Sequence, residues 1–527
     1  MNEKPDSPTV SRRQLLIGAG ALAGTLAVGG TALTDATAAS ASSTKWPTTK
    51  LPRSAAKTVD AGDFVTARQL ESWQHDLDAM GMRSTGSPIH EQFIDLLITR
   101  LGEAGVQDVH TEPVPFPRWS ASHWALEVPY GPHAGTIPTA SYLPYAGGTS
   151  AAGVTCELAV ILPGAMPAKG SLTGKIALFA MPVGSIAYSL METIAYGKYD
   201  PDGVLSPTGN YSRPWTGVGD LITLLDALDT SGAAGAIGII DLPADAAHGS
   251  YFPYDGTIRN VPGVFVDRDA GATLQKLALE GTSVRLTVRS TVEHMVSRNV
   301  VGLIPGRSDE YIILNSHSDG PNGVEDNGPD AIIAMANYLT RLPKDSLPRS
   351  ILITFTTGHF HGGLGQVTFA KKHRNTTLRR AACAITLEHL GALAWEENEQ
   401  GDMTLTGQPE LGVLFLPENK ALVDASLAAI TRASAGPALA LRPYVSVPEA
   451  PNGYGWPGEG TQLWSDGHVM TMNYITGPTY LLNWGIPTVK KTDFALMHRE
   501  IVSFTQMVLD LGGVPKASLS ALDLTPL

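Results

Sequence analysis

Two short segments of this chain place histidine close to carboxylate residues and a third carries two histidines, side chains that proteins use to bind metal ions and to move protons. The first is His317-Ser318-Asp319, and Asp326 follows it across a loop rich in glycine, proline and asparagine. In an extended chain His317 and Asp319 point to the same side, so we predict that the Asp319 carboxylate orients the His317 ring. Asp326 precedes a helical pattern, and its alternative role is to cap that helix.

The second and third segments carry three more histidines and a glutamate. His359 and His361 lie among glycines just after an apolar run, a setting typical of a functional loop. Glu388 and His389 follow the next apolar run. Neighbouring residues of a strand point to opposite faces, so His389 is expected to point away from Glu388 and to belong to the core or the surface.

Each of these segments comes directly after a predicted strand. Apolar runs rich in β-branched residues predict strands at 311–315, 351–356 and 384–387, and helical periodicity predicts helices at 331–342 and 366–373. This alternation indicates an α/β fold, a mostly parallel sheet flanked by helices. In such sheets the functional residues gather at the carboxyl ends of the strands.

The strand ends therefore bring one histidine and two carboxylates to the same edge of the sheet. Imidazole nitrogen and carboxylate oxygen are donors that suit zinc. We predict that His317, Asp326 and Glu388 bind a zinc ion, and that another divalent ion could replace it. The alternative is three unrelated polar loop ends.

The rest of the chain divides by composition. Arg12 and Arg13 precede an apolar run that ends at Ala36-Thr37-Ala38, which is the layout of a twin-arginine export signal. A membrane anchor is the alternative reading of this run. We expect export by the twin-arginine route to the cell envelope or the medium. The expected parts are a signal peptide at 1–38, a linker at 39–60, the first part of the main domain at 61–118, an inserted β-rich domain at 119–295, the main domain at 296–515 and a tail at 516–527.

Composition excludes several functions. The chain has 527 residues and a net charge of −13, and an acidic chain argues against a nucleic-acid partner. Beyond the export signal no apolar run is long enough to span a membrane, so no membrane association is expected after cleavage. The two cysteines, Cys156 and Cys383, are too few for a cysteine zinc site, and whether they pair is left open. The sequence does not predict an oligomeric state.

Several motifs resemble the zinc aminopeptidases of the bacterial leucyl-aminopeptidase type, relatives of glutamate carboxypeptidase and glutaminyl cyclase. The resemblance runs from about Phe64 to Leu511. It rests on Asn299–Gly306, the His-x-Asp at 317–319, Asp326-Asn327, Leu387–Gly391, Arg83–Ser87 and Gly485-Ile486-Pro487. In the inserted part, Gly174–Leu178, Ala233–Ile240 and Val261–Val264 resemble the protease-associated domain.

The resemblance implies a two-zinc site of which this chain has kept one half. The family's first metal takes residues that match His317, Asp326 and Glu388. The private ligands of the second metal match Phe360 and Val489, which cannot bind zinc. The resemblance therefore implies a single zinc.

The family's general base, a glutamate, is replaced by His359. An imidazole can take a proton at neutral pH, so the catalytic residues are expected to be His359 and Asp319, with His361 as another base or a fourth ligand. The resemblance also suggests that Asp466 and His468 line a substrate pocket.

Two functions remain in competition. One is hydrolysis of an amide bond in a peptide or an acylated amino acid, with zinc activating water. The other is a catalytically inactive family member that binds peptides or protein partners, since a fold does not fix a function. A serine hydrolase is not supported, because the sequence has no Gly-x-Ser-x-Gly motif.

Overall fold

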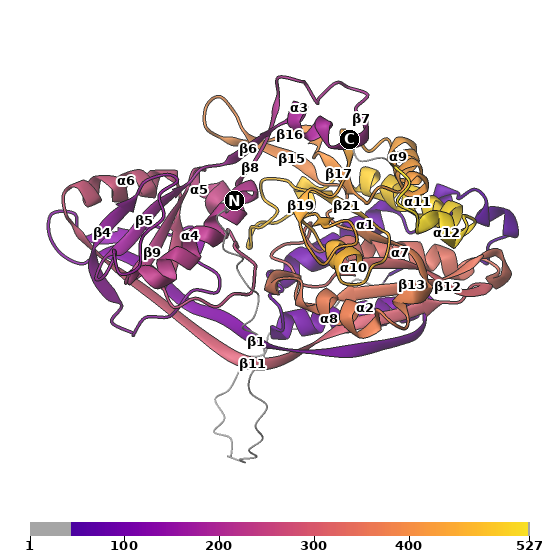
Figure 1. Cartoon of the computed structure of the whole chain (residues 1–527), viewed down its shortest axis with the longest axis horizontal. Coiled ribbons are helices and arrows are strands. Elements are labelled where there is room, and N and C mark those ends of the chain that lie inside the picture. Colours follow the sequence, from indigo (N-terminus) through magenta and orange to yellow (C-terminus); the bar gives the residue numbers. More distant parts are fainter. Residues whose placement is uncertain (1–43, 525–527) are drawn as a thin grey trace, which may run out of the picture. The chain divides into compact units, whose positions relative to one another are not determined.

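The computed structural model describes residues 44–524 (Figure 1). The predicted export signal lies outside the described residues. Within them the chain forms an α/β fold, as predicted, and its main sheet is mixed. The four strands at its centre are parallel neighbours, in the order β13 (Arg349–Thr356), β12 (Ser308–His317), β14 (Ala381–Leu387) and β21 (Thr471–Thr476). The strands predicted at 351–356, 311–315 and 384–387 are confirmed within β13, β12 and β14.

Antiparallel pairs flank this parallel centre. On one side β11 (Ser283–Ile304) pairs with β13. On the other side β17 (Gly412–Phe415) runs antiparallel to β21, and β18 (Ala438–Leu441) runs parallel to β17. Strand β13 is buried along its whole length, which fits the apolar residues Ile351, Leu352, Ile353 and Phe355 within it.

Helices cover both faces of the main sheet. Ile312 and Leu314 of β12 pack into the larger core. Ile313, which points to the opposite face, packs into a smaller one. The helices of the larger core are α1 (Ala67–Met80), α2 (Pro88–Glu103), α7 (Gly328–Arg341), α9 (Lys420–Ala433) and α11 (Phe494–Gly512), and those of the smaller core are α8 (Leu364–His373) and α10 (Thr461–Ser465). Helices α7 and α8 confirm the helices predicted at 331–342 and 366–373.

A long two-stranded ribbon leads from the main sheet to the inserted part of the chain. It consists of β1 (Gln107–Val128) and β11, each 22 residues long and antiparallel to each other. Figure 1 shows it along the lower edge of the molecule. The predicted domain limits, 119 and 295, fall inside this ribbon, on opposite strands and near the same rung, since Trp119 pairs with Val292 and Phe116 with Met295.

The inserted part has its own sheet and core. Its strands lie in the order β3, β10, β9, β5 and β4, and β4 joins the ribbon through β11. Leu126, Leu178 and Ile237 are among the residues that form its buried core. The resemblance to a protease-associated domain stays a prediction. The elements here are β2 (Gly135–Ile137), β3 (Ser141–Tyr142), β4 (Val154–Ile161), β5 (Ile176–Met181), α4 (Val218–Ser231), β9 (Gly235–Ile240), α5 (Ala244–Ala247), β10 (Gly263–Val266) and α6 (Arg268–Leu279).

One excursion of the inserted part reaches the main sheet. Residues 184–215, called the strap below, contain β6 (Gly184–Ala187), α3 (Tyr188–Thr193), β7 (Ala195–Tyr199) and β8 (Asn210–Arg213). Strands β6 and β8 pair with each other, and β7 adds to the main sheet antiparallel to β18. The strap is therefore held by main-chain hydrogen bonds to the sheet that carries the strand ends of interest.

The described part of the predicted linker is packed against the main domain. Leu51 is buried, and its N–H donates to the Arg341 carbonyl at 3.0 Å. The Trp46 ring lies 5.5 Å from that of Trp73. The remaining elements of the main domain are β15 (Leu393–Glu397), β16 (Met403–Pro409), β19 (Val445–Ser446), β20 (Tyr454–Gly455) and α12 (Lys516–Leu519).

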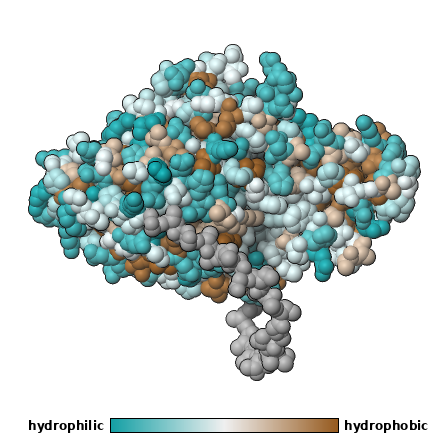
Figure 2. Space-filling view, turned by 180° about the vertical axis from the view of Figure 1, so that it is seen from behind, coloured by the Kyte–Doolittle hydropathy of each residue, from teal (hydrophilic) through white to brown (hydrophobic). Residues whose placement is uncertain are grey.

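None of the described helices is both long and apolar enough to cross a bilayer. In Figure 2 hydrophobic residues are scattered in small groups over the visible face, among hydrophilic ones. Such scattered groups are normal for a protein surface.

A buried carboxyl group on α11 makes stability depend on pH. Glu500 accepts hydrogen bonds from the Tyr474 hydroxyl at 2.6 Å and from the Gly391 N–H at 2.9 Å. Burial raises its pKa from 4.5 to about 7. The folded state therefore holds the proton more tightly than the unfolded state. The resulting stabilisation is complete below pH 4.5 and is lost as the pH rises through 7.

We expect Glu500→Gln, which imitates the neutral carboxyl group, to remove this dependence. Between pH 5 and pH 8 the wild type should lose about 3 kcal/mol more stability than the variant, at about 1.4 kcal/mol per pKa unit. Calorimetric melting temperatures of both proteins at the two pH values measure the difference. Parallel pH profiles of the two proteins would contradict the assignment.

Candidate metal centre

Histidines at three strand ends converge. His317 is the last residue of β12, His359 begins a short 3₁₀ helix after β13, and His389 comes two residues after β14. Gly328, at the start of α7, lets the loop before it approach β14, because a Cβ there would lie 2.1 Å from the Leu387 carbonyl oxygen. That loop carries Glu325.

The three imidazole rings are oriented in the same way. In each ring Nδ1 faces an oxygen acceptor: the Asp319 carbonyl for His317 at 2.9 Å, the Glu459 carboxylate for His359 at 2.9 Å, and the Thr476 carbonyl for His389 at 2.6 Å. A carbonyl oxygen only accepts, so Nδ1 carries the proton in His317 and His389. Their Nε2 atoms keep a free lone pair, which is the arrangement of metal-binding histidines.

Glu325 and Glu388 complete the group. His317 Nε2 lies 3.6 Å from Glu388 Oε2 and 3.9 Å from Glu325 Oε2. His389 Nε2 lies 3.0 Å from Glu325 Oε2 and 3.9 Å from Glu388 Oε2. These four atoms are buried and have no hydrogen-bond partner among the described residues. Four such atoms in one place are costly unless a cation joins them.

The donor set fits zinc. Zinc binds histidine nitrogen and carboxylate oxygen at about 2.0–2.2 Å in a tetrahedron, which separates its ligand atoms by about 3.4 Å. The four separations of 3.0–3.9 Å lie around that value. His359 adjoins this set, with Nε2 at 4.0 Å from Glu325 Oε1 and its ring stacked on His317 at 4.3 Å, and His317, Glu325 and His359 form a second group whose ligand atoms lie within 4.8 Å of one another.

Neighbouring groups hold Glu388 in this position. Its Oε1 accepts hydrogen bonds from the Asn473 side chain at 2.7 Å and from the Glu459 N–H at 3.0 Å, so Oε2 is the oxygen that faces the histidines. Burial acts to raise the pKa of Glu388, but the imidazoles of His317 and His389 lower it to about 2. Burial acts to lower the pKa of His317, yet Glu325 and Glu388 raise it well above its ordinary value. The lowered pKa of Glu388 and the raised pKa of His317 both show that the centre favours positive charge.

Asp326 is placed differently from the prediction. Its two carboxylate oxygens accept from Arg83, at 2.6 Å from Nε and 2.5 Å from an Nη atom, and both side chains are buried. Its oxygens are therefore occupied by a guanidinium, and Glu325, one residue earlier, supplies the inward carboxylate. Asp326 does not cap α7 either, because the N-cap residue is Asn327.

Asp319 orients His317 through its main chain. The carbonyl of Asp319 accepts from His317 Nδ1. Its carboxylate instead accepts from the N–H groups of His359 at 3.1 Å and Phe360 at 3.0 Å, and from the Thr85 hydroxyl at 2.6 Å. The prediction that the Asp319 carboxylate orients the His317 ring is therefore corrected. The carboxylate instead fixes the loop that carries His359.

The prediction that His389 points away is wrong. The strand ends at Leu387, and His389 has a φ of +58°, in the left-handed region. The alternation of an extended strand no longer applies there. The backbone turns, and the ring comes back to the side of Glu388.

His361, Asp466 and His468 lie outside the converging group. His361 packs edge-on against the rings of Phe116 at 5.1 Å and Tyr145 at 5.5 Å. Asp466 and His468 follow α10 and face α8, where Asp466 lies 3.9 Å from Lys371 Nζ and the exposed His468 contacts Arg374. Neither Asp466 nor His468 borders the cavity described next.

Sequence reasoning missed two residues of the site. Glu325 could have been considered as a ligand from the sequence, since it adjoins Asp326 in the same loop. Glu459 lies in a loop before α10 and is buried. It accepts from His359 and from the Thr356 hydroxyl. No local pattern marks it, because its partners lie about a hundred residues earlier in the chain.

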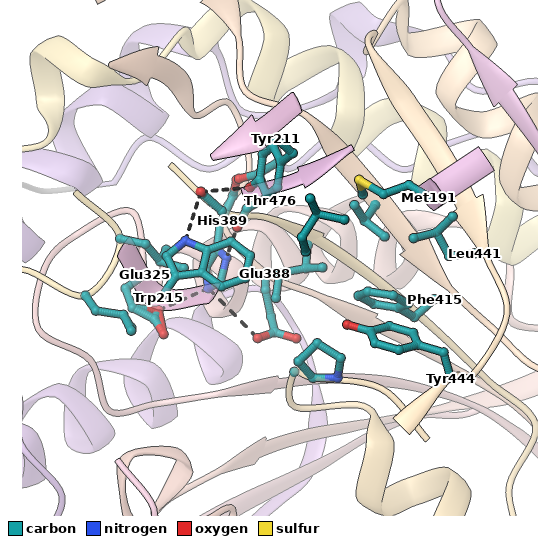
Figure 3. A pocket seen from close by; sticks show the side chains of 18 of the residues that line it. Met191, Tyr211, Trp215, Glu325, Glu388, His389, Phe415, Leu441, Tyr444 and Thr476 are labelled. Carbon is teal, nitrogen blue, oxygen red and sulfur yellow. Dashed lines mark hydrogen bonds and ion pairs between the residues drawn. The ribbon is translucent and has the colours of Figure 1, made fainter. Parts of the chain in front are cut away.

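A cavity of about 420 Å³ opens directly beside the centre. Glu325, His359, Glu388 and His389 border it. In Figure 3 Glu325, Glu388 and His389 lie on one side, and the apolar residues Met191, Leu441 and Phe415 on the other. A mostly apolar cavity with a few converging polar groups is the usual form of a substrate site.

Comparisons with known proteins agree with this fold. Residues 299–410 match the profile of peptidase family M28. No curated protein matches the chain. A zinc aminopeptidase from Bacillus subtilis superposes with a TM-score of 0.58 at 14% identity, covering 84% of this chain and 94% of that one.

Two further structures are similar. An aminopeptidase from Aneurinibacillus sp. strain AM-1 has a TM-score of 0.54 at 15% identity, covering 84% of this chain and 92% of its own. A peptidase M28 precursor from Shewanella amazonensis SB2B has a TM-score of 0.58 at 17% identity, covering 88% and 98%. The chain therefore contains a segment similar to peptidase family M28 and shares its overall fold with these peptidase structures.

Proposed function

We propose that this protein is a zinc-dependent hydrolase of amide bonds, in peptides or acylated amino acids, with one zinc ion bound by His317, Glu325, Glu388 and His389. The observation that carries the proposal is the set of four inward, buried atoms without hydrogen-bond partners in the described residues, at the wall of an apolar cavity. The similarity to zinc aminopeptidases supports the same metal.

The residues around that ion have different roles from the ion itself. Zinc supplies Lewis-acid polarisation of the amide carbonyl and activation of water. Glu388 and His389 are held by Asn473, the Glu459 N–H and the Thr476 carbonyl, which fixes the ligand atoms before substrate arrives.

His359 is the proposed general base. Its Nδ1 donates to Glu459, so its Nε2 lone pair is free, and the ring borders the cavity. From there it can take a proton from water and deliver it to the leaving nitrogen. Glu459 holds the ring in the required tautomer and stabilises the imidazolium once it forms.

Metal content tests the proposal. We expect the purified mature protein to contain one zinc per chain by elemental mass spectrometry, and His317→Ala to contain none. Two zinc ions per chain would contradict the single-metal site. One zinc without hydrolysis of any peptide or acylated amino acid would favour the inactive, binding member of the family.

We further propose that the protein is exported by the twin-arginine route. The adjacent Arg12 and Arg13, followed by an apolar run, support it. Replacing both arginines by lysine should leave the protein in the cytoplasm with its first 38 residues uncleaved, because the route reads the arginine pair. Cell fractionation with immunodetection measures this, and undiminished export of the lysine variant would contradict the route.

A further inference from the structure

The cavity beside the metal centre is built for an uncharged group. The lysines and arginines of the described residues do not border it, and its charged neighbours are confined to the metal centre and His359. Its other walls include Met191, Val413, Phe415, Leu441 and Ile475. At about 420 Å³ it is much larger than the roughly 150 Å³ that holds a benzene ring in an engineered protein cavity. A single aromatic side chain would leave most of it empty.

The centre offers no spare carboxylate for a free amino group. Glu325 and Glu388 are the carboxylates that border the cavity, and both belong to the proposed ligand set. Glu459 lies behind His359, where it accepts from His359 Nδ1 and the Thr356 hydroxyl. A substrate with an ammonium group next to the scissile carbonyl would therefore bring a charge into an apolar cavity without an acidic partner, which is costly.

The strap forms the outer wall of the cavity. It contributes Ile186, Leu190, Met191, Ile194 and Tyr211. These residues lie in or next to β6, α3 and β8, and β7, which lies between α3 and β8, is hydrogen-bonded to β18, so the strap is anchored to the main sheet. The apolar volume is thus a fixed feature of the fold.

We infer that the group on the carbonyl side of the scissile bond is a long, apolar acyl group without an α-amino group, so that the substrate is an N-acylated amine or amino acid. This inference rests on the proposed function. Hydrolysis breaks the amide C–N bond, adds the hydroxyl of water to the acyl carbon and its hydrogen to the nitrogen, and releases a carboxylic acid and an amine. The cavity residues bind the chain, and the strap selects its length.

Binding calorimetry with small amides tests the inference. Chain length is compared in metal-free protein, and the effect of the amino group is compared in the zinc-loaded His359→Ala variant, in which zinc occupies Glu325 and Glu388 and turnover is slow. Hexanamide and octanamide differ by two methylenes, and 2-aminooctanamide differs from octanamide only by the amino group. Each buried methylene should tighten binding about fourfold, so octanamide should bind more than tenfold tighter than hexanamide. It should also bind at least tenfold tighter than 2-aminooctanamide. Equal or tighter binding of 2-aminooctanamide would overturn the inference, and so would affinity that is independent of chain length.

A pair of matched variants locates the binding in the strap. Leu190 borders the cavity and is 62% exposed, and Leu279, at the end of α6, is 89% exposed and does not border it. Leu190→Glu should weaken octanamide binding at least tenfold, and Leu279→Glu should leave it unchanged. Neither replacement disturbs a core. An unchanged affinity in Leu190→Glu would overturn the assignment of the strap.

The two proposals fail in different ways. A protein that binds one zinc and hydrolyses amides but prefers 2-aminooctanamide contradicts the acyl-chain inference alone. A protein that binds octanamide with the expected chain-length dependence but takes up no zinc contradicts the proposed function.

Discussion

Glu325→Gln is expected to lower zinc affinity by more than about 100-fold, whereas the adjacent Asp326→Asn should keep zinc binding close to that of the wild type. Replacing a group that only supports a ligand costs about 10–100-fold in metal affinity, and loss of a ligand costs more. Glu325 Oε2 faces His317 and His389, but both oxygens of Asp326 are bound by Arg83. Competition with a chelator of known affinity, followed by elemental analysis, measures the difference.

The control for this pair is stability. Asp326→Asn leaves the buried Arg83 charge without its carboxylate, which costs about 3–5 kcal/mol of folding free energy in comparable buried pairs. Thermal unfolding should therefore show Asp326→Asn to be destabilised. If Asp326→Asn folds stably and loses zinc while Glu325→Gln retains it, the ligand assignment is reversed and the bridging role implied by the family resemblance is restored.

His359→Ala is expected to lower kcat by about 10²–10⁴, the usual contribution of a positioned acid–base group, while zinc content stays at one per chain. The reason is that His359 borders the cavity, and its Nε2 is not among the four buried atoms that lack a hydrogen-bond partner in the described residues. Steady-state kinetics on an amide substrate, together with metal analysis of the same sample, checks both halves of this prediction.

His361→Ala is the matched control, since it lies two residues away in the same 3₁₀ helix and packs on Phe116 and Tyr145. Its kcat should stay within about threefold of the wild type, because removing packing alone does not touch the reacting atoms. Added imidazole should restore part of the activity of His359→Ala and none of that lost in His317→Ala. Zinc loss in His359→Ala would mean that His359 is a ligand and not a base.

The fold could be predicted largely from the sequence because its central strands and helices are long and regular. The runs at 312–314, 351–356 and 384–387 are buried and mostly apolar, so their pattern predicts strands. The rule that sites lie at the carboxyl ends of such strands then located His317, His359 and Glu388 together. These three predictions needed no information beyond local pattern.

The details of the site depended on contacts that no local pattern contains. Whether Glu325 or Asp326 faces the centre is decided by Arg83, a residue 243 positions away that occupies Asp326. The direction of His389 is decided by one backbone angle just beyond the strand, where strand periodicity ceases to hold. Glu459 could not be predicted from the sequence, because its contacts with His359 and Thr356 form only in the folded chain.

The pairing of β7 with β18 has a consequence for how the chain can be divided. Residues 438–441 of β18 are apolar and fully buried, and β7 occupies the open row of hydrogen-bonding groups along that strand. An unprotected apolar edge of this kind recruits other chains. A catalytic domain excised without the strap should therefore self-associate, and the inserted part protects the protein against aggregation whatever other purpose it serves.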